Sequence, residues 1–226
     1  MRESEKTNAR RPADFFRAYL AGKVIDIGAG SDPVIAQAES FDTPDGDAND
    51  ILRFRRPESY DCVYSSHCLE HMNDPRSALR LWWALLRPGG HLVLVVPHED
   101  LYEQGYWPSL FNRGHKVTFR LGGATSWSPV SIDLHELVVS LPGSEIVSEE
   151  VQDDEYDYRL QGSGRRYIEF LRLLANRLIG TGDTAHGLGQ IAFPMLWLLA
   201  AMGTPIDQTR GPALAQIQIV ARKRPA

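Results

Sequence analysis

A short apolar strand that runs directly into a glycine turn constrains the fold of this 226-residue chain more than any other stretch. Residues 24–27 read Val-Ile-Asp-Ile, and Gly28-Ala29-Gly30 follow at once. A β-branched apolar run that ends at glycine predicts a buried strand. Small residues after such a strand let a nucleotide-like ligand approach the backbone closely. We therefore expect a ligand site at the end of this strand.

Strand-like and helix-like segments alternate along the chain, which predicts an α/β sheet with right-handed crossovers. The further strand-like segments are 60–67, 91–97, 144–153 and 214–223, and the helix-like ones are 12–20, 75–88 and 128–141. The helix that starts at residue 75 has clear boundaries. Asp74 is a suitable N-cap, Pro75 suits the first helical position, and Gly89-Gly90 form a stop.

Residues 160–211 break this alternation just before the last strand-like segment. They carry helical patterns at 165–179 and 188–202, so we predict a helical insertion or lid within a single domain over residues 1–226. The insertion would cover the active site or form the interface of a homodimer, and both alternatives stay open. Its most apolar run is interrupted by Pro194 and falls short of the ~20 residues that span a membrane.

Net charge and cysteine count limit the partners that the protein can bind and the cell compartment in which it is expected. The net charge of -5 offers no cationic surface of the kind that nucleic acid favours, so we expect no nucleic-acid partner. Only two cysteines are present, Cys62 and Cys68, which cannot form a disulfide framework. The N-terminal residues are charged and contain no apolar signal segment. These features predict a cytoplasmic protein.

The glycine turn suits some nucleotide-like ligands better than others. Pro33 stands where a dinucleotide-binding turn has its third glycine, and Asp32 would place a negative charge near a pyrophosphate. No Gly-Lys-Ser/Thr follows, which argues against a phosphate-binding loop. S-adenosylmethionine carries no phosphate and needs only close backbone approach beside acidic side chains. The turn therefore favours this cofactor over NAD.

Residues 60–97 closely resemble the central region of class I S-adenosylmethionine-dependent methyltransferases. The resemblance is carried, together with Val24–Gly30, by Tyr60-Asp61, Ser65-Ser66-His67, Leu69-Glu70-His71 and Leu86-Arg87-Pro88-Gly89-Gly90. It implies a methyltransferase enzyme with a Rossmann-like, mostly parallel sheet and flanking helices. The segment from Glu99 to Lys116 is similar, more loosely, to methyltransferases of bacterial surface-polysaccharide gene sets.

The resemblance also implies which residues bind S-adenosylmethionine. Gly28, Ala29 and Gly30 would admit its methionine part, and Asp26 would orient the turn and hold the amino group. Asp42, in the position of the acid that ends the second strand, would bind the ribose hydroxyls. The remaining residues implied to contact the cofactor are Asp47 and Ala48 near the adenine, and Ser66 and His67 near the methyl group.

The stretch between the first strand and residue 60 is shorter than the family pattern. About a dozen residues separate Gly30 from Asp42, which is too few for a full crossover helix. The predicted sheet is therefore shortened between strands 1 and 4 of the family's order. Asp45 and Asp50 are alternative candidates for the ribose and adenine contacts.

The acceptor is expected to be a hydroxyl of a small polar molecule, such as a sugar or glycan. Nitrogen methyltransferases of this superfamily commonly carry Asn/Asp-Pro-Pro-Tyr after the fourth strand, where this chain has Ser65-Ser66-His67-Cys68. The segment after residue 97 is rich in aromatic and acidic residues that suit a polar ring. The predicted substrate-binding residues are His98, Asp100, Tyr102, Tyr106, Asn112 and His115.

Three residues are candidates for the chemistry of transfer. His67 would line the transfer centre, and His115 would take the proton of the acceptor hydroxyl. Tyr102 is the third catalytic candidate. We predict no metal site, although His98 stands beside Glu99 and Asp100. The alternative functions are a non-catalytic scaffold that keeps the methyltransferase fold and, less favoured, an NAD-dependent oxidoreductase.

Overall fold

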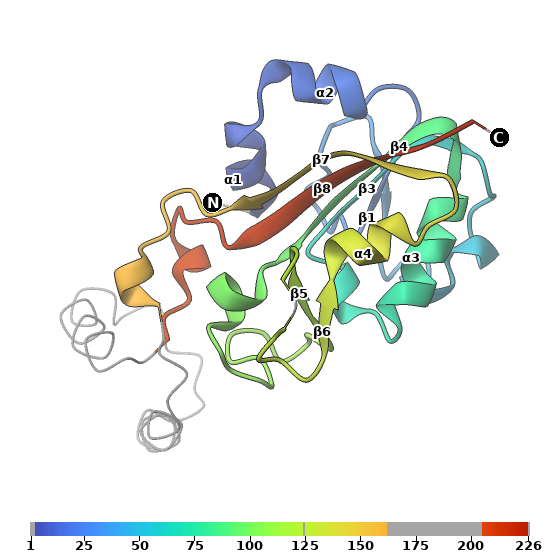
Figure 1. The fold of residues 1–226 in the computed structure, drawn as a ribbon. Helices are drawn as coiled ribbons and strands as arrows, with labels where there is room; N and C mark the ends of the chain where they lie inside the picture. The colour runs from blue at the N-terminus through green and yellow to red at the C-terminus, as the bar shows by residue number, and fades with distance from the viewer. Residues whose placement is uncertain (1–2, 124, 162–204, 226) are drawn as a thin grey trace.

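A six-stranded sheet forms the centre of the molecule (Figure 1). The computed structural model describes residues 3–123, 125–161 and 205–225. The strands of this sheet are β1 (Val24–Ile27), β2 (Glu39–Phe41), β3 (Tyr60–Ser66), β4 (Leu86–Pro97), β7 (Ser144–Gln152) and β8 (Gln216–Lys223). Their order is β2-β1-β3-β4-β8-β7, in which β2, β1, β3 and β4 run parallel and β8 pairs antiparallel with both β4 and β7. The predicted Rossmann-like, mostly parallel sheet is confirmed.

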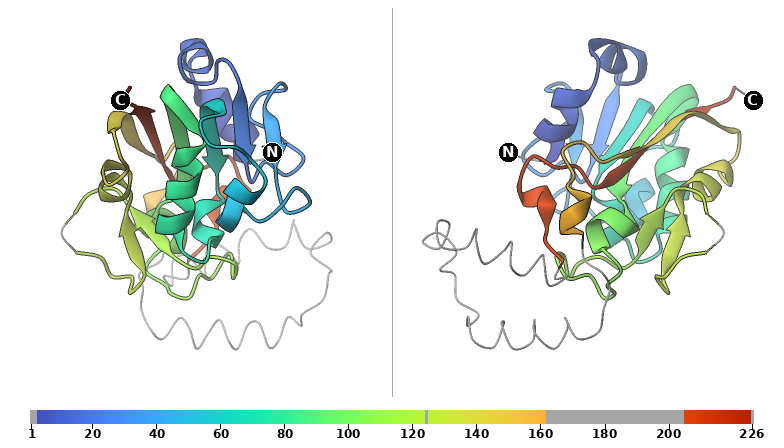
Figure 2. Two further views of the ribbon diagram at one scale, coloured as in Figure 1. Left: turned by 90° about the vertical axis from the view of Figure 1, so that its right-hand side faces the viewer. Right: turned by 60° about the vertical axis from the view of Figure 1, so that its left-hand side comes forward.

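Helices cover both faces of the sheet (Figures 1 and 2). The helices α1 (Glu3–Arg10) and α2 (Ala13–Tyr19) lie on one face, and α3 (Pro75–Ala84) and α4 (Leu134–Val139) lie on the other. Successive strand residues point to opposite faces, so Val24 packs with Phe15 of α2, whereas Ile25 belongs to the core that contains Trp82 of α3. This two-sided burial explains why the central strands are apolar throughout.

The start of α3 is as predicted, but its end is not. The Asp74 carboxylate accepts hydrogen bonds from the backbone N–H groups of Arg76 and Ser77, as an N-cap does. The helix ends at Ala84, before the predicted glycine stop, because Leu86 already pairs with Tyr60 in the sheet. Residues 89 and 90 therefore lie within β4.

The predicted helix over 128–141 is wrong in its first half. Ser131–Asp133 instead forms β6, which pairs in parallel with β5 (Thr118–Arg120) in a separate two-stranded sheet. The Ser131 hydroxyl donates to the buried Glu99 carboxylate, and Ile132 joins the main core. These tertiary contacts override the local helix pattern, and α4 begins only after Asp133, which caps it.

The predicted shortening between β1 and β3 is also confirmed. Residues 31–59, all of them described, contain only the three-residue β2 and the 3-10 helix η1 (Ala48–Arg53). No helix crosses over from β1 to β2 in this stretch. The sheet consequently ends at β2, and the segment after Phe41 turns directly back over the carboxyl ends of the strands.

The segment before the last strand interrupts a pair of neighbouring strands. β7 and β8 lie side by side and antiparallel, with the short helices η4 (Tyr158–Leu160) and η5 (Gln208–Arg210) on either side of residues 162–204. The predicted helices at 165–179 and 188–202 fall outside the described residues, so the lid and the homodimer interface stay predictions. Among the helices that the structure describes, none has both the length and the apolar character required to cross a membrane.

Candidate active site

A cavity of about 620 Å³ lies at the carboxyl ends of three parallel strands. Gly28 follows β1, Phe41 and Asp42 stand at the end of β2, and His67 and Cys68 follow β3. Open α/β sheets bind ligands in the crevice outside these strand ends. The volume falls in the range of small-molecule sites, roughly 300–1,000 Å³.

The glycine turn brings the walls of this cavity close together. Gly28 has a φ angle of +85°, and a Cβ atom there would lie 2.6 Å from the Cβ of Cys68. Gly30, at φ +56°, donates its backbone N–H to the Asp42 carboxylate at 2.7 Å. Glycine is required at residue 28 both for the left-handed backbone and for the contact with the segment after β3.

Asp26 stabilises the turn from its buried side. Its side chain is 3% exposed and accepts a hydrogen bond from the Val34 backbone N–H at 2.7 Å. Burial raises the pKa of Asp26 to about 7, although the hydrogen bond from Val34 lowers it. The carboxyl group does not line the cavity. Three other residues predicted to contact the cofactor likewise lie outside its lining, namely Ala29, Gly30 and Ser66.

Asp42, Asp47 and Ala48 do line the cavity, whereas the alternatives Asp45 and Asp50 do not. Hydrogen bonds from the Thr43 backbone and from Gly30 hold the pKa of Asp42 below its ordinary value. Hydrogen bonds from Asn49 lower the pKa of Asp47 in the same way. Both groups are therefore carboxylates near neutral pH, and their oxygens can accept hydrogen bonds from hydroxyl and amino groups.

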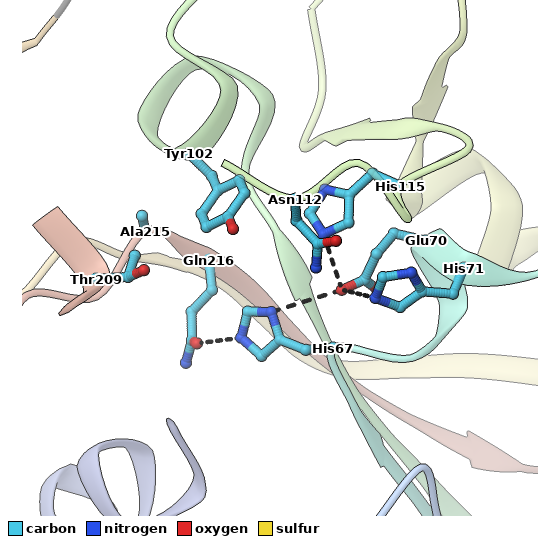
Figure 3. A pocket seen from close by; sticks show the side chains of 9 residues that line it. All are labelled: His67, Glu70, His71, Tyr102, Asn112, His115, Thr209, Ala215 and Gln216. Atoms are coloured by element: carbon cyan, nitrogen blue, oxygen red, sulfur yellow. Dashed lines mark hydrogen bonds and ion pairs between the residues drawn. The ribbon is translucent and has the colours of Figure 1, made fainter. Parts of the chain in front are cut away.

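A second, smaller cavity of about 150 Å³ adjoins the first. Figure 3 shows the residues that line this smaller cavity. His67 and His71 line both cavities, so the two spaces share a wall. The three predicted catalytic residues, His67, Tyr102 and His115, all line the smaller cavity, as does the predicted substrate residue Asn112. The sequence thus identified four of its nine lining residues; those it missed are Glu70, His71, Thr209, Ala215 and Gln216.

Glu70 lies at the centre of the smaller cavity's polar wall. Its side chain is 1% exposed, and neither carboxylate oxygen receives a hydrogen bond from the described residues. Its Oε1 atom faces His67 Nδ1 at 3.6 Å, His115 Nε2 at 3.8 Å and His71 Nε2 at 4.0 Å (Figure 3). Burial raises the pKa of the Glu70 carboxyl, but His67 and His115 outweigh this effect and hold that pKa below its ordinary value.

Two separate segments meet at this wall. Glu70 and His71 belong to the 3-10 helix η2 (Leu69–His71) after β3, and His115 follows a tight turn that begins at Asn112. The Lys116 backbone N–H donates to the Glu70 carbonyl at 2.8 Å and joins the two segments. The Leu-Glu-His motif was visible in the sequence, but this contact between segments was not.

The other predicted substrate residues lie away from the smaller cavity. The Nδ1 atom of His98 accepts the Asp100 backbone N–H, and the Asp100 carboxylate accepts from the Trp127 indole N–H at 2.8 Å. Tyr106 is 5% exposed and packs inside the protein. Glu99, which is buried, accepts hydrogen bonds from three hydroxyl groups. Residues 98–100 therefore do not converge on a common ligand.

The cavities fit S-adenosylmethionine. The Gly28 turn provides the close backbone approach that its methionine part needs. The carboxylate of Asp42 stands at the end of β2, where hydroxyl groups of a ribose can donate to it. Among the described residues, no lysine or arginine lines the larger cavity, which agrees with a ligand that carries no phosphate.

Comparisons with known proteins bear on the same region. The family model described as methyltransferase domain matches residues 4–127, more than half of the chain. The ubiquinone biosynthesis O-methyltransferase of Ralstonia nicotianae is 38% identical to this chain over 53 residues. Those residues are 24% of this chain and 22% of that protein, so the matched stretch spans about a fifth of the relative's length.

Two solved structures are similar to this chain at low sequence identity. A chain from the complex between the Haloferax volcanii Trm112 methyltransferase activator and a methyltransferase is 13% identical, with a TM-score of 0.50 over 98% of this chain and 89% of that chain. A SAM-dependent methyltransferase from Archaeoglobus fulgidus is 14% identical, with a TM-score of 0.49 over 98% and 95% of the two chains. At such identities the likeness concerns the fold alone.

The family match covers every residue that lines the larger cavity and six of the nine that line the smaller one; Thr209, Ala215 and Gln216 lie beyond it. It includes the glycine turn, the strands β1 to β4 and the segment that carries Tyr102 and His115. It confirms the predicted resemblance to class I S-adenosylmethionine-dependent methyltransferases, and with it an enzyme that uses S-adenosylmethionine as cofactor. The resemblance to surface-polysaccharide methyltransferases stays a prediction. The chain belongs to the methyltransferase domain family.

Proposed function

We propose that the protein transfers a methyl group from S-adenosylmethionine to a hydroxyl of a small polar acceptor, such as a sugar or glycan. The observation that carries this proposal is the shared wall of the two cavities, where His67 and His71 face both. A cofactor in the larger cavity and an acceptor in the smaller one would meet at this wall. Such placement of two reactants supplies much of the rate enhancement of a displacement reaction.

Side chains of this enzyme would position the cofactor. Asp42 would accept hydrogen bonds from its ribose hydroxyls, and Asp47 would accept one from an amino group. Gly28 would leave room for its methionine part. When bound, the cofactor supplies an electrophilic methyl group on a positively charged sulfur.

Residues of the smaller cavity would prepare the acceptor. His115 donates its Nδ1 proton to Glu103 and presents Nε2 to the cavity, where it can take up the hydroxyl proton. The acceptor oxygen then forms a bond to the methyl carbon as the carbon–sulfur bond breaks, which yields a methyl ether and S-adenosylhomocysteine. Tyr102 and Asn112 line the same space and offer hydrogen bonds to neighbouring polar groups of the acceptor.

The size and lining of the smaller cavity support a polar acceptor, and only one edge of that acceptor would enter the cavity. About 150 Å³ holds a few heavy atoms, and the lining is mainly imidazole, carboxylate, amide and hydroxyl groups. The matched relative is named an O-methyltransferase, which agrees with oxygen as the methylated atom. These features favour a hydroxyl-bearing ring over an apolar acceptor.

An acceptor screen tests the proposal. The purified protein is incubated with S-adenosylmethionine labelled in the methyl group, and label transfer is measured to nucleotide sugars, free glycans, catechols and primary amines. We expect transfer to hydroxyl acceptors, with the highest rates on sugars. Transfer confined to amines would contradict oxygen methylation. Transfer confined to catechols would contradict a sugar acceptor but would still support methylation of a hydroxyl group.

A further inference from the structure

The polar wall of the smaller cavity has the architecture of a metal site. Glu70, His71 and His115 each offer one ligand atom, and the three atoms lie within 4.8 Å of one another. Glu70 is 1% exposed, and neither carboxylate oxygen receives a hydrogen bond of normal length and angle from the part of the chain described; its nearest ionisable neighbour is His67, whose Nδ1 lies 3.6 Å from Oε1. A buried carboxylate without hydrogen bonds is costly unless a cation or donor compensates it.

The hydrogen bonds behind the two histidines determine which nitrogen faces Glu70. His71 Nδ1 lies 2.9 Å from the Gly114 carbonyl, and His115 Nδ1 lies 2.6 Å from the Glu103 carboxylate. Both partners are acceptors only, so each Nδ1 carries a proton and donates it. In the neutral form of each ring, Nε2 then presents a lone pair toward Glu70 Oε1.

The spacing of these atoms fits an ion better than direct hydrogen bonds. The two Nε2 atoms lie 3.8 and 4.0 Å from Glu70 Oε1, beyond the range of an N–H···O hydrogen bond. A tetrahedral zinc ion with bonds of about 2.0–2.2 Å sets its ligand atoms roughly 3.3 Å apart. To close the site, the two histidines would move toward Glu70 by about half an ångström each and toward one another from a separation of at most 4.8 Å.

We propose that Glu70, His71 and His115 bind one divalent transition-metal ion of the zinc class. Two imidazoles and one carboxylate form a ligand set known from catalytic zinc sites, in which a fourth position stays open. Imidazole ligands favour zinc, cobalt or nickel over magnesium and calcium, which prefer oxygen donors. The proposal revises the prediction that the protein has no metal site.

The residues behind the site support its ligands in the way that metal sites require. Glu103 is buried and holds His115, so that a carboxylate, a histidine and the proposed ion would stand in line. Gly114 holds His71 through its carbonyl, and a Cβ atom at residue 114 would lie only 3.0 Å from His71 Nδ1. Glycine therefore permits the close approach that orients His71.

The role of the ion rests on the proposed function, whereas its binding does not. The open position would face the smaller cavity, where the acceptor hydroxyl enters. There the hydroxyl oxygen would bind the ion, lose its proton to solvent and act as the nucleophile. His115 would then be a ligand, and the ion would take over the activation of the hydroxyl.

Cobalt titration tests the metal site without any acceptor. The full-length protein is freed of metal with a chelator and titrated with Co²⁺, followed by its visible absorption, and then with Zn²⁺ as the competitor. We expect one equivalent of Co²⁺ in a tetrahedral or five-coordinate spectrum that Zn²⁺ abolishes. In Glu70→Gln and His115→Gln the affinity should fall at least about 100-fold, more than outer-shell changes cause.

His135→Gln is the matched control, because His135 is a half-buried histidine that pairs with Glu149 outside both cavities. This variant should bind Co²⁺ like the wild type. The proposal is overturned if the wild type binds no stoichiometric Co²⁺, or if Glu70→Gln and His115→Gln bind it as tightly as the wild type.

S-adenosylhomocysteine titration of the same samples separates the two proposals. Retained binding of S-adenosylhomocysteine by Glu70→Gln shows that the variant is folded and that its loss of Co²⁺ reports on the site. A wild type that binds S-adenosylhomocysteine and no metal overturns the metal site and leaves the methyltransferase intact. A wild type that binds Co²⁺ through Glu70 and His115 without S-adenosylhomocysteine supports the site and contradicts its role in methyl transfer.

Discussion

His115 Nδ1 lies 2.6 Å from the Glu103 carboxylate, and both side chains are buried. The two residues come from different segments, since Glu103 ends the short π-helix η3 (Glu99–Glu103) after β4. This contact selects the tautomer of His115 and points its Nε2 atom at Glu70 and the smaller cavity. Glu103 is therefore a positioning residue for His115, whether His115 acts as a base or as a metal ligand.

Glu103→Gln tests this relationship. The amide oxygen can still accept the Nδ1 proton, but the negative charge that makes His115 a strong ligand or base is lost. We expect about a 10–100-fold loss of Co²⁺ affinity, with the affinity for S-adenosylhomocysteine unchanged. Glu149→Gln is the matched control, because Glu149 pairs with His135 outside both cavities. Equal effects of the two substitutions would refute a positioning role for Glu103.

Asp42→Ala tests the cofactor cavity. If the Asp42 carboxylate binds the ribose hydroxyls, its removal should weaken the binding of S-adenosylhomocysteine by about 1–3 kcal/mol, which calorimetry can measure. Asp50→Ala should leave that affinity within error, because Asp50 does not line the cavity. A greater loss in Asp50→Ala than in Asp42→Ala would reverse the assignment.

Gly28→Ala tests the close contact between the glycine turn and the segment after β3. Gly89 has almost the same φ angle, +86° against +85°, but a Cβ atom there would meet nothing within 4 Å. Gly89→Ala should therefore lower the free energy of unfolding by about 1–2 kcal/mol, which is the strain of an alanine in the left-handed backbone conformation. Gly28→Ala should cost more and should also weaken S-adenosylhomocysteine binding, as urea unfolding and calorimetry would show. Equal losses of unfolding free energy in the two variants would mean that the protein accommodates a Cβ atom beside Cys68 without strain, which would contradict a tight contact there.

Asp26 predicts a pH dependence of stability. Because burial raises its pKa from 3.8 to about 7, the folded protein keeps a proton between these pH values that the unfolded chain releases. The stabilisation is fully present below pH 3.8 and is lost as the pH rises to about 7, by up to about 1.4 kcal/mol per pH unit. Asp26→Asn, which can still accept from Val34, should remove this contribution from the free energy of unfolding measured at pH 5, 6 and 7. An unchanged slope in that variant would show that Asp26 is not responsible.

Local sequence signals predicted those parts of the fold that local energetics determine. The Val24–Ile27 strand and the Asp74 cap appear where the pattern placed them. The first half of the predicted helix over 128–141 is wrong because Ser131 and Ile132 gain more from Glu99 and the core than from helix formation. Such contacts join residues that are distant along the chain, so no local pattern contains them.

The candidate site shows the same division. His67, Tyr102 and His115 were predicted because each carries chemistry in a loop that follows a strand. Gln216 was missed because β8 pairs antiparallel with β4, which brings residue 216 beside residue 97. The sequence marks Glu70 only as part of the Leu-Glu-His motif. Its burial among three histidines depends on the contact between two distant segments that the hydrogen bond from Lys116 joins.

Calorimetric titration of the wild-type protein with S-adenosylhomocysteine, with NADH as the control ligand, tests the assignment of the larger cavity most directly. We predict one binding site per chain with micromolar affinity for S-adenosylhomocysteine and no heat of binding for NADH. Binding of NADH in place of S-adenosylhomocysteine, or of neither ligand, would contradict a cofactor site built on the Gly28 turn and Asp42.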